Sequence, residues 1–141
     1  MTDTKEKPKL NFSPLDAYRK TEVMTANRET LLLMLYAGAL RFLKSAIAAV
    51  ERKDIQEKNR LLIKTQEIIS ELRSTLNFEI GGELAKRLDS LYSFITRRLL
   101  QGQMEANIQP LREALGVLET LNEAWEKAIT SLKSADAKVK E

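Results

Sequence analysis

The stretch ETLLLMLYAGALRFL, residues 29–43, is almost continuously apolar in a chain that is otherwise mixed in polarity. On an α-helix continued to about Arg52, its apolar residues cover an arc of roughly 220°, whereas a surface helix needs little more than about 100°. Arg41 and Lys44 interrupt the run before it reaches the roughly 18 residues of a membrane span. Two faces of this helix therefore have to be covered.

Two explanations account for the wide apolar face. In the first, the helix is the central one of a bundle, or a short segment at residues 13–22 folds over its second face. In the second, one face is kept as an apolar groove for a partner protein. Gly38 fits both, because a glycine lets either a bundle neighbour or a bound backbone come close. The sequence leaves the two explanations open.

Capping and breaking residues divide the chain into helices. Asn27 is expected to cap the apolar helix, and Asp54 followed by Glu57 forms a capping box for the next one. Asn107 is a further cap, and Gly81-Gly82 marks a break. The predicted helices are residues 28–52, 55–76, 83–103 and 108–132, preceded by a short amphipathic segment that starts at Ser13-Pro14.

The connections between these helices must be short, because only 5 glycines and 3 prolines are present. Long helices with short connections lie antiparallel to their neighbours. We therefore predict an all-α fold, an antiparallel four-helix bundle with a short extra N-terminal helical segment. Residues 1–12 are expected to be a flexible leader, 13–132 the bundle domain and 133–141 a flexible tail.

The three later helices each carry one apolar stripe at helical spacing. These stripes predict the bundle core, which comprises Leu61, Leu62, Thr65, Ile68, Ile69, Leu72 and Leu76, then Leu84, Leu88, Leu91, Tyr92, Ile95 and Leu99, then Leu111, Leu115, Leu118, Leu121, Trp125, Ala128, Ile129 and Leu132.

Composition excludes most catalytic and metal-binding functions. The chain has no histidine and no cysteine, so it cannot build the usual zinc sites, a histidine-based triad or a cysteine nucleophile. Carboxylates such as Glu29, Glu67 and Glu71 are scattered, which is typical of solvated charges. We therefore expect no enzyme activity, no cofactor and no metal.

The charges and the N-terminus bear on partners and location. The net charge is +3, from 23 basic and 20 acidic residues whose signs alternate along the chain, which disfavours a nucleic-acid partner. The N-terminal residues MTDTKEKPKLNF contain no apolar run that could serve as a signal peptide. We expect a cytoplasmic protein that does not insert into a membrane.

Four sequence blocks, in order and at matching separations, resemble the FliS family of flagellar export chaperones. They are AYRKTEVMTA (17–26), MLYAGALRFL (34–43), LNFEIGGELAKRLDSLYSFITRRL (76–99) and LETLNEAW (118–125). The resemblance spans nearly the whole domain, from about Leu15 to Ala128. It implies a helical bundle that binds the disordered C-terminal segment of flagellin in the cytoplasm, prevents premature polymerisation and delivers flagellin to the flagellar export apparatus.

The expected partner groove combines the wide apolar helix with the N-terminal segment. The predicted partner-binding residues are Tyr18, Val23, Leu31, Met34, Leu35, Tyr36 and Phe42. Residues 13–24 are expected to act as a movable lid, because so short a segment must take its order from a neighbour. Without cargo we expect a monomer or a weak dimer.

Two alternatives remain beside the chaperone hypothesis. One is a regulatory bundle that binds an anionic partner through Arg19, Lys20, Arg97 and Arg98, with binding that weakens steeply in salt. The other is a structural bundle whose extra apolar face pairs with a second copy.

Overall fold

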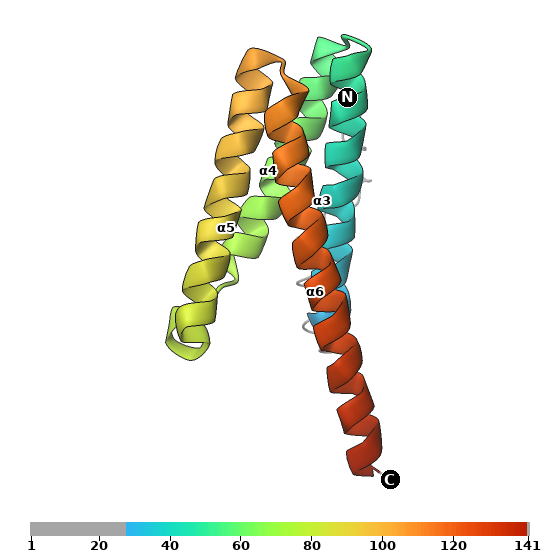
Figure 1. Ribbon diagram of the computed structural model, residues 1–141, viewed down its shortest axis with the longest axis vertical. Coiled ribbons are helices and arrows are strands. Elements are labelled where there is room, and N and C mark those ends of the chain that lie inside the picture. The colour runs from blue at the N-terminus through green and yellow to red at the C-terminus, as the bar shows by residue number, and fades with distance from the viewer. Residues whose placement is uncertain (1–27, 141) are drawn as a thin grey trace, which may run out of the picture.

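The computed structural model describes residues 28–140, which form four α-helices and no strand (Figure 1). The helices are α3 (Arg28–Glu51), α4 (Ile55–Ser74), α5 (Phe78–Glu105) and α6 (Ile108–Lys140). Both α3 and α5 pack against α4 and α6, so the four helices form a ring. The predicted all-α four-helix bundle is confirmed. The segment expected at residues 13–22 and the proposed lid at 13–24 lie outside the described residues.

Side-chain pairs between helices show the antiparallel register. Arg112 near the start of α6 pairs with Glu51 at the end of α3, at 3.1 Å. Further along, Glu119 of α6 pairs with Lys44 of α3, at 4.0 Å. The residue numbers rise on one helix as they fall on the other, so the two helices run in opposite directions.

Asparagine and aspartate caps set the helix starts. Asp54 accepts a hydrogen bond from the Glu57 amide at 3.1 Å, and Asn107 accepts one from the Gln109 amide at 3.0 Å, as predicted. Asn77 does the same for the amides of Glu79 and Ile80. The start predicted for the third helix at residue 83 was therefore wrong, because Asn77 caps it five residues earlier.

The glycine pair bends α5 instead of ending a helix. Gly82 has φ 51° and ψ −123°, which is not a helical conformation, and helical turns continue on both sides of it. A positive φ is readily adopted by glycine and is strained for other residues. The expected break is thus a kink inside α5.

Helix α6 is longer than predicted. We expected it to end near Leu132, followed by a frayed tail, but it continues to Lys140 and extends well beyond the ends of the other helices (Figure 1). Residues 133–140 contain no glycine or proline and are mostly lysine and alanine, which are good helix formers. Nothing local therefore stops the helix at Leu132.

The wide apolar face of α3 is largely covered by its two bundle neighbours. Leu35, Tyr36, Ala39, Leu43 and Ala46 are buried in the core. Gly38 allows a close approach, because a Cβ there would stand 3.3 Å from the Ile68 side chain of α4. By length and composition alone α3 could span a membrane, yet 44% of its most apolar window is buried inside the bundle. It is the core helix of the first explanation.

Four residues of the predicted stripes are exposed. On α5 these are Leu84 and Leu91, and on α6 they are Ala128 and Leu132. Helices α5 and α6 lie close where they are connected and diverge toward their other ends, and the last turns of α6 project past the bundle (Figure 1). These stripe positions were predicted wrongly because none of the four described helices covers them.

A polar cluster joins three helices inside the core. The hydroxyls of Tyr36 on α3 and Tyr92 on α5 are 2.5 Å apart, and Trp125 of α6 donates its indole N–H to the Tyr36 hydroxyl at 3.2 Å. Burial raises the pKa of both tyrosines, so both hydroxyls stay protonated at neutral pH. Tyr36 is thus the shared member of two hydrogen bonds.

Substitution of two glycines by alanine should change the free energy of unfolding in opposite directions. Gly82→Ala should lower the free energy of unfolding by about 1–3 kcal/mol, because alanine is strained at this φ. Gly116→Ala should raise it by about 0.5–1 kcal/mol, since a Cβ at this exposed helical position meets nothing within 4 Å. Urea unfolding measures both. A Gly82→Ala variant as stable as the parent would contradict the kink.

The shared hydroxyl of Tyr36 predicts an order among three variants. Tyr36→Phe should cost about 2–3 kcal/mol, because it leaves both the Trp125 indole and the buried Tyr92 hydroxyl without this partner. Tyr92→Phe and Trp125→Phe each break one bond and leave Tyr36 with the other, so the lost hydrogen bond should cost about 1 kcal/mol. Thermal and urea unfolding would show the order. Equal costs for Tyr36→Phe and Tyr92→Phe would rule out the shared bond.

Candidate functional site

The structure separates the sequence-predicted partner-binding residues. Tyr18 and Val23 lie outside the described residues. Leu31, Leu35 and Tyr36 are buried, at 4%, 3% and 0% exposure, so a partner could not reach them in this conformation. Met34 is 47% exposed, and Phe42 is half-buried on the flank of α3 that faces α4. Of the described members, only Met34 and Phe42 are accessible.

An apolar groove lies along the outer side of the α5/α6 seam. It encloses a hollow of about 490 Å³ between the two helices. Leu91 and Phe94 line it from α5, and Val117 and Leu121 line it from α6. Leu84, two turns before Leu91, is 59% exposed and lies on the same flank of α5. We call this surface, from Leu84 to Leu121, the α5/α6 groove.

Polar side chains form the rim of the α5/α6 groove. Arg112, Glu113 and Thr120 of α6 line its edge. Across the seam, Arg98 pairs with Glu113 at 2.9 Å and its guanidinium lies 5.9 Å from the centre of the Phe94 ring. An apolar floor with a polar rim is the usual make-up of a protein-binding surface.

The sequence contained an indication of this groove, but we had assigned the residues concerned to the core. Leu84 and Leu91 are seven residues apart, so they share one side of α5, displaced from the line of Leu88, Tyr92 and Ile95. Val117 and Leu121 are similarly displaced on α6. An apolar stripe that is too wide to be covered by the neighbouring helix indicates that part of it stays exposed between the two helices. The divergence of α5 from α6, however, cannot be predicted from the sequence.

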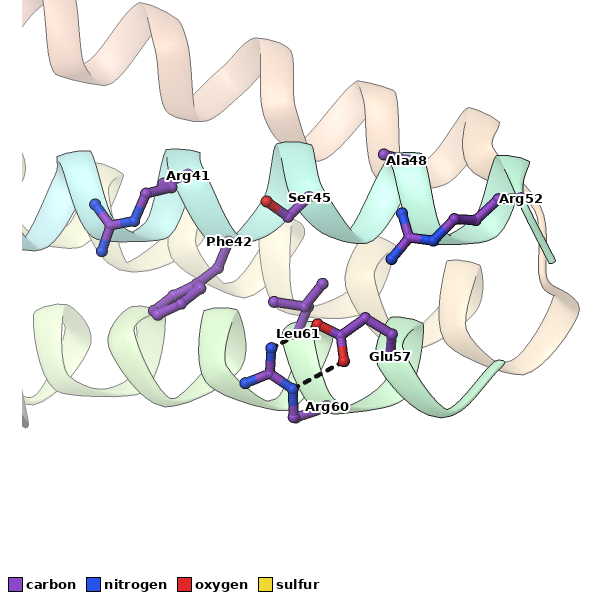
Figure 2. Close-up of a pocket in the computed structure, with 8 residues that line it drawn as sticks. All are labelled: Arg41, Phe42, Ser45, Ala48, Arg52, Glu57, Arg60 and Leu61. Atoms are coloured by element: carbon purple, nitrogen blue, oxygen red, sulfur yellow. Dashed lines mark hydrogen bonds and ion pairs between the residues drawn. The ribbon is translucent and has the colours of Figure 1, made fainter. Parts of the chain in front are cut away.

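A second hollow, of about 360 Å³, lies between α3 and α4. Figure 2 shows Phe42 reaching from α3 toward α4, with Arg41 at one end of the hollow and Arg52 at the other. Arg60 of α4 holds Glu57 at 2.6 Å, and this ion pair raises the pKa of Arg60 and lowers that of Glu57. We call this surface the α3/α4 hollow. It is basic, whereas the α5/α6 groove is mainly apolar.

The described part of the chain contains no cluster of metal-ligating side chains. No three carboxylates there are grouped as a metal ion would require. Glu29 and Glu67 are exposed and Glu71 is half-buried, at separate places on α3 and α4. The α5/α6 groove and the α3/α4 hollow are the candidate sites among the described residues, and both are lined in part by apolar side chains.

Comparison with known proteins supplies the family. A family model described as "Flagellar protein FliS" matches residues 11–132. The chain belongs to the FliS family. Two relatives named "Flagellar secretion chaperone FliS" come from Bacillus subtilis (strain 168) and Salmonella typhimurium. The first is 40% identical over 119 residues, covering 84% of this chain and 88% of the relative. The second is 36% identical over 109 residues, covering 77% and 81%.

A Vibrio cholerae relative with the same name is 33% identical over 117 residues, covering 80% of this chain and 86% of its own length. These matches extend along nearly the full length of each FliS relative. They confirm the resemblance seen in the four sequence blocks and support a role as a flagellar secretion chaperone.

Proposed function

We propose that this FliS chaperone binds the disordered C-terminal segment of flagellin in the cytoplasm, and that the segment lies in the α5/α6 groove. Covering that segment would prevent premature polymerisation until flagellin is delivered to the flagellar export apparatus. The observation that carries the proposal is the uncovered apolar floor of the groove, in a chain whose relatives are secretion chaperones.

The groove suits an amphipathic helix that forms on binding. A partner helix can place one apolar face on Leu84, Leu91 and Phe94 while its other face stays in water. Ordering a disordered segment uses on the order of 2–5 kcal/mol or more of the gross interaction energy. The resulting moderate affinity fits a cargo that must later be released.

The sequence-predicted contacts fit this proposal in part. Met34 and Phe42 are accessible and remain proposed partner contacts, but both lie on α3 outside the α5/α6 groove, so the cargo segment placed there would not touch them. Tyr18 and Val23 also remain proposals, outside the described residues. Leu31, Leu35 and Tyr36 could contact a partner only if the bundle opened. The free chaperone is proposed to be a monomer or a weak dimer.

The anionic-partner alternative loses one of its residues. Arg98 is bound to Glu113 and Gln101, and Arg97 donates a hydrogen bond to Ser93. Arg98 is thus occupied as part of the groove rim, and no specific observation favours this alternative.

Flagellin binding should depend on the flagellin C-terminus and on the groove floor. Intact flagellin should form a stoichiometric complex with the chaperone, and flagellin without its C-terminal segment should not. The Leu84→Glu/Leu91→Glu variant should weaken the complex roughly tenfold or more, because charges would face the apolar side of the cargo. Isothermal titration calorimetry and size exclusion measure both effects.

Ile63→Glu is the matched control, because Ile63 is 48% exposed on α4 and lies outside the groove. This variant should bind flagellin normally. Equal binding of truncated and intact flagellin would refute the proposed cargo. An equal loss with Ile63→Glu would refute the proposed location.

A further inference from the structure

The α3/α4 hollow concentrates positive charge on one side of the bundle. Arg41 reaches it from α3, Arg52 from the turn directly after α3, and Arg60 from α4 (Figure 2). Glu57 is the sole carboxylate among its lining residues. Phe42, Ala48 and Leu61 supply an apolar floor between the charged ends. The surface therefore combines a hydrophobic centre with unbalanced positive charge.

Two of the three arginines are available to a ligand. Arg60 is committed to Glu57, with two hydrogen bonds of 3.1 and 2.6 Å. Arg52 has only a loose contact of 3.8 Å with Asp54. Among the described residues Arg41 pairs with no carboxylate, and its guanidinium stands 5.2 Å from the centre of the Phe42 ring.

The spacing of the two available arginines determines which spacing of carboxylates on a partner they can bind. Arg41 lies on α3 and Arg52 lies in the turn directly after its last residue, where the Arg52 amide still donates to the Ala48 carbonyl at 3.1 Å. The two arginines are eleven positions apart, which corresponds to three helical turns or about 16 Å. A partner helix along the seam would meet both with two carboxylates three turns apart, and an apolar side chain between them would lie over Phe42. Guanidinium groups bind carboxylates through paired hydrogen bonds, which favours this match.

We propose that the α3/α4 hollow binds an acidic amphipathic helix of a second partner protein, independently of the cargo. In the ring of helices the α3/α4 seam is opposite the α5/α6 seam, so one helix cannot occupy both. The chaperone can therefore hold cargo on one side and the acidic helix on the other. The central apolar floor of Phe42, Ala48 and Leu61 suits the apolar face of a helix and offers nothing to a sugar-phosphate backbone, which favours an acidic helix over nucleic acid.

The test uses two synthetic helical peptides and the full chain. The acidic peptide carries two glutamates three turns apart with leucines between them, and its control carries glutamines in their place. In fluorescence anisotropy the acidic peptide should bind and the glutamine peptide should bind much more weakly. Arg41→Gln/Arg52→Gln should weaken the acidic peptide roughly tenfold, as expected for two exposed charge pairs.

Lys86→Gln/Arg87→Gln is the matched control, because it removes the same charge from exposed residues on α5. This variant should bind the acidic peptide as the parent does. Failure of the acidic peptide to bind, equal binding of both peptides, or an equal loss with the control variant would each overturn the proposal. Displacement by a lower concentration of single-stranded oligonucleotide would overturn it in favour of nucleic acid.

A ternary experiment separates this site from the cargo site. Saturating flagellin should leave the affinity for the acidic peptide unchanged, and Leu84→Glu/Leu91→Glu should do so too. Competition between flagellin and the peptide would place both on one surface and overturn the independence of the two sites. Loss of flagellin binding in the Arg41→Gln/Arg52→Gln variant would likewise overturn the independence of the two sites.

Discussion

Helix α3 packs against α4 and α6 along its apolar face, and the rest of the bundle depends on this double contact. Its wide arc leaves few apolar residues exposed, so α4 and α6 are held at fixed positions on either side of it. Helix α5 closes the ring from the opposite corner, linked to α3 across the core through the Tyr36 and Tyr92 hydroxyls. Away from their connection α5 and α6 diverge (Figure 1).

The divergence explains how a stable bundle keeps an apolar surface uncovered. Leu84 and Leu91 are not buried by α6, which is hydrogen-bonded to α3 through Trp125 and Tyr36. Exposing these two leucines costs little of the free energy of folding, because Leu88, Tyr92 and Ile95 of the same helix are buried in the core. The candidate binding surface thus arises from the geometry of the core.

The existence of the helices and two of their caps could be predicted from local sequence, but some helix ends were predicted wrongly. Asp54 and Asn107 were recognised because a cap acts on amides two or three residues away. Asn77 was overlooked beside Gly81-Gly82, since a glycine pair can either end a helix or kink it. The end of α6 was misplaced because its last turns carry no apolar stripe that would indicate a continuing helix.

The candidate sites were harder to predict than the fold. A stripe on one helix reports which side is apolar, but not whether a neighbour covers it, so Leu84 and Leu91 read as core residues. The α3/α4 hollow depends on the register that brings Glu57 and Arg60 of α4 beside Arg41 and Phe42 of α3, and no local pattern encodes such a register. Phe42 was predicted as a partner contact from its place on α3, and its basic surroundings appear only in the folded bundle.

Hydrogen–deuterium exchange with and without intact flagellin tests the central claim, that cargo lies in the α5/α6 groove, most directly. The account predicts slower exchange on binding in residues 84–94 and 116–125, with unchanged exchange in residues 41–61. Slower exchange confined to residues 41–61, with α5 and α6 unaffected, would contradict it.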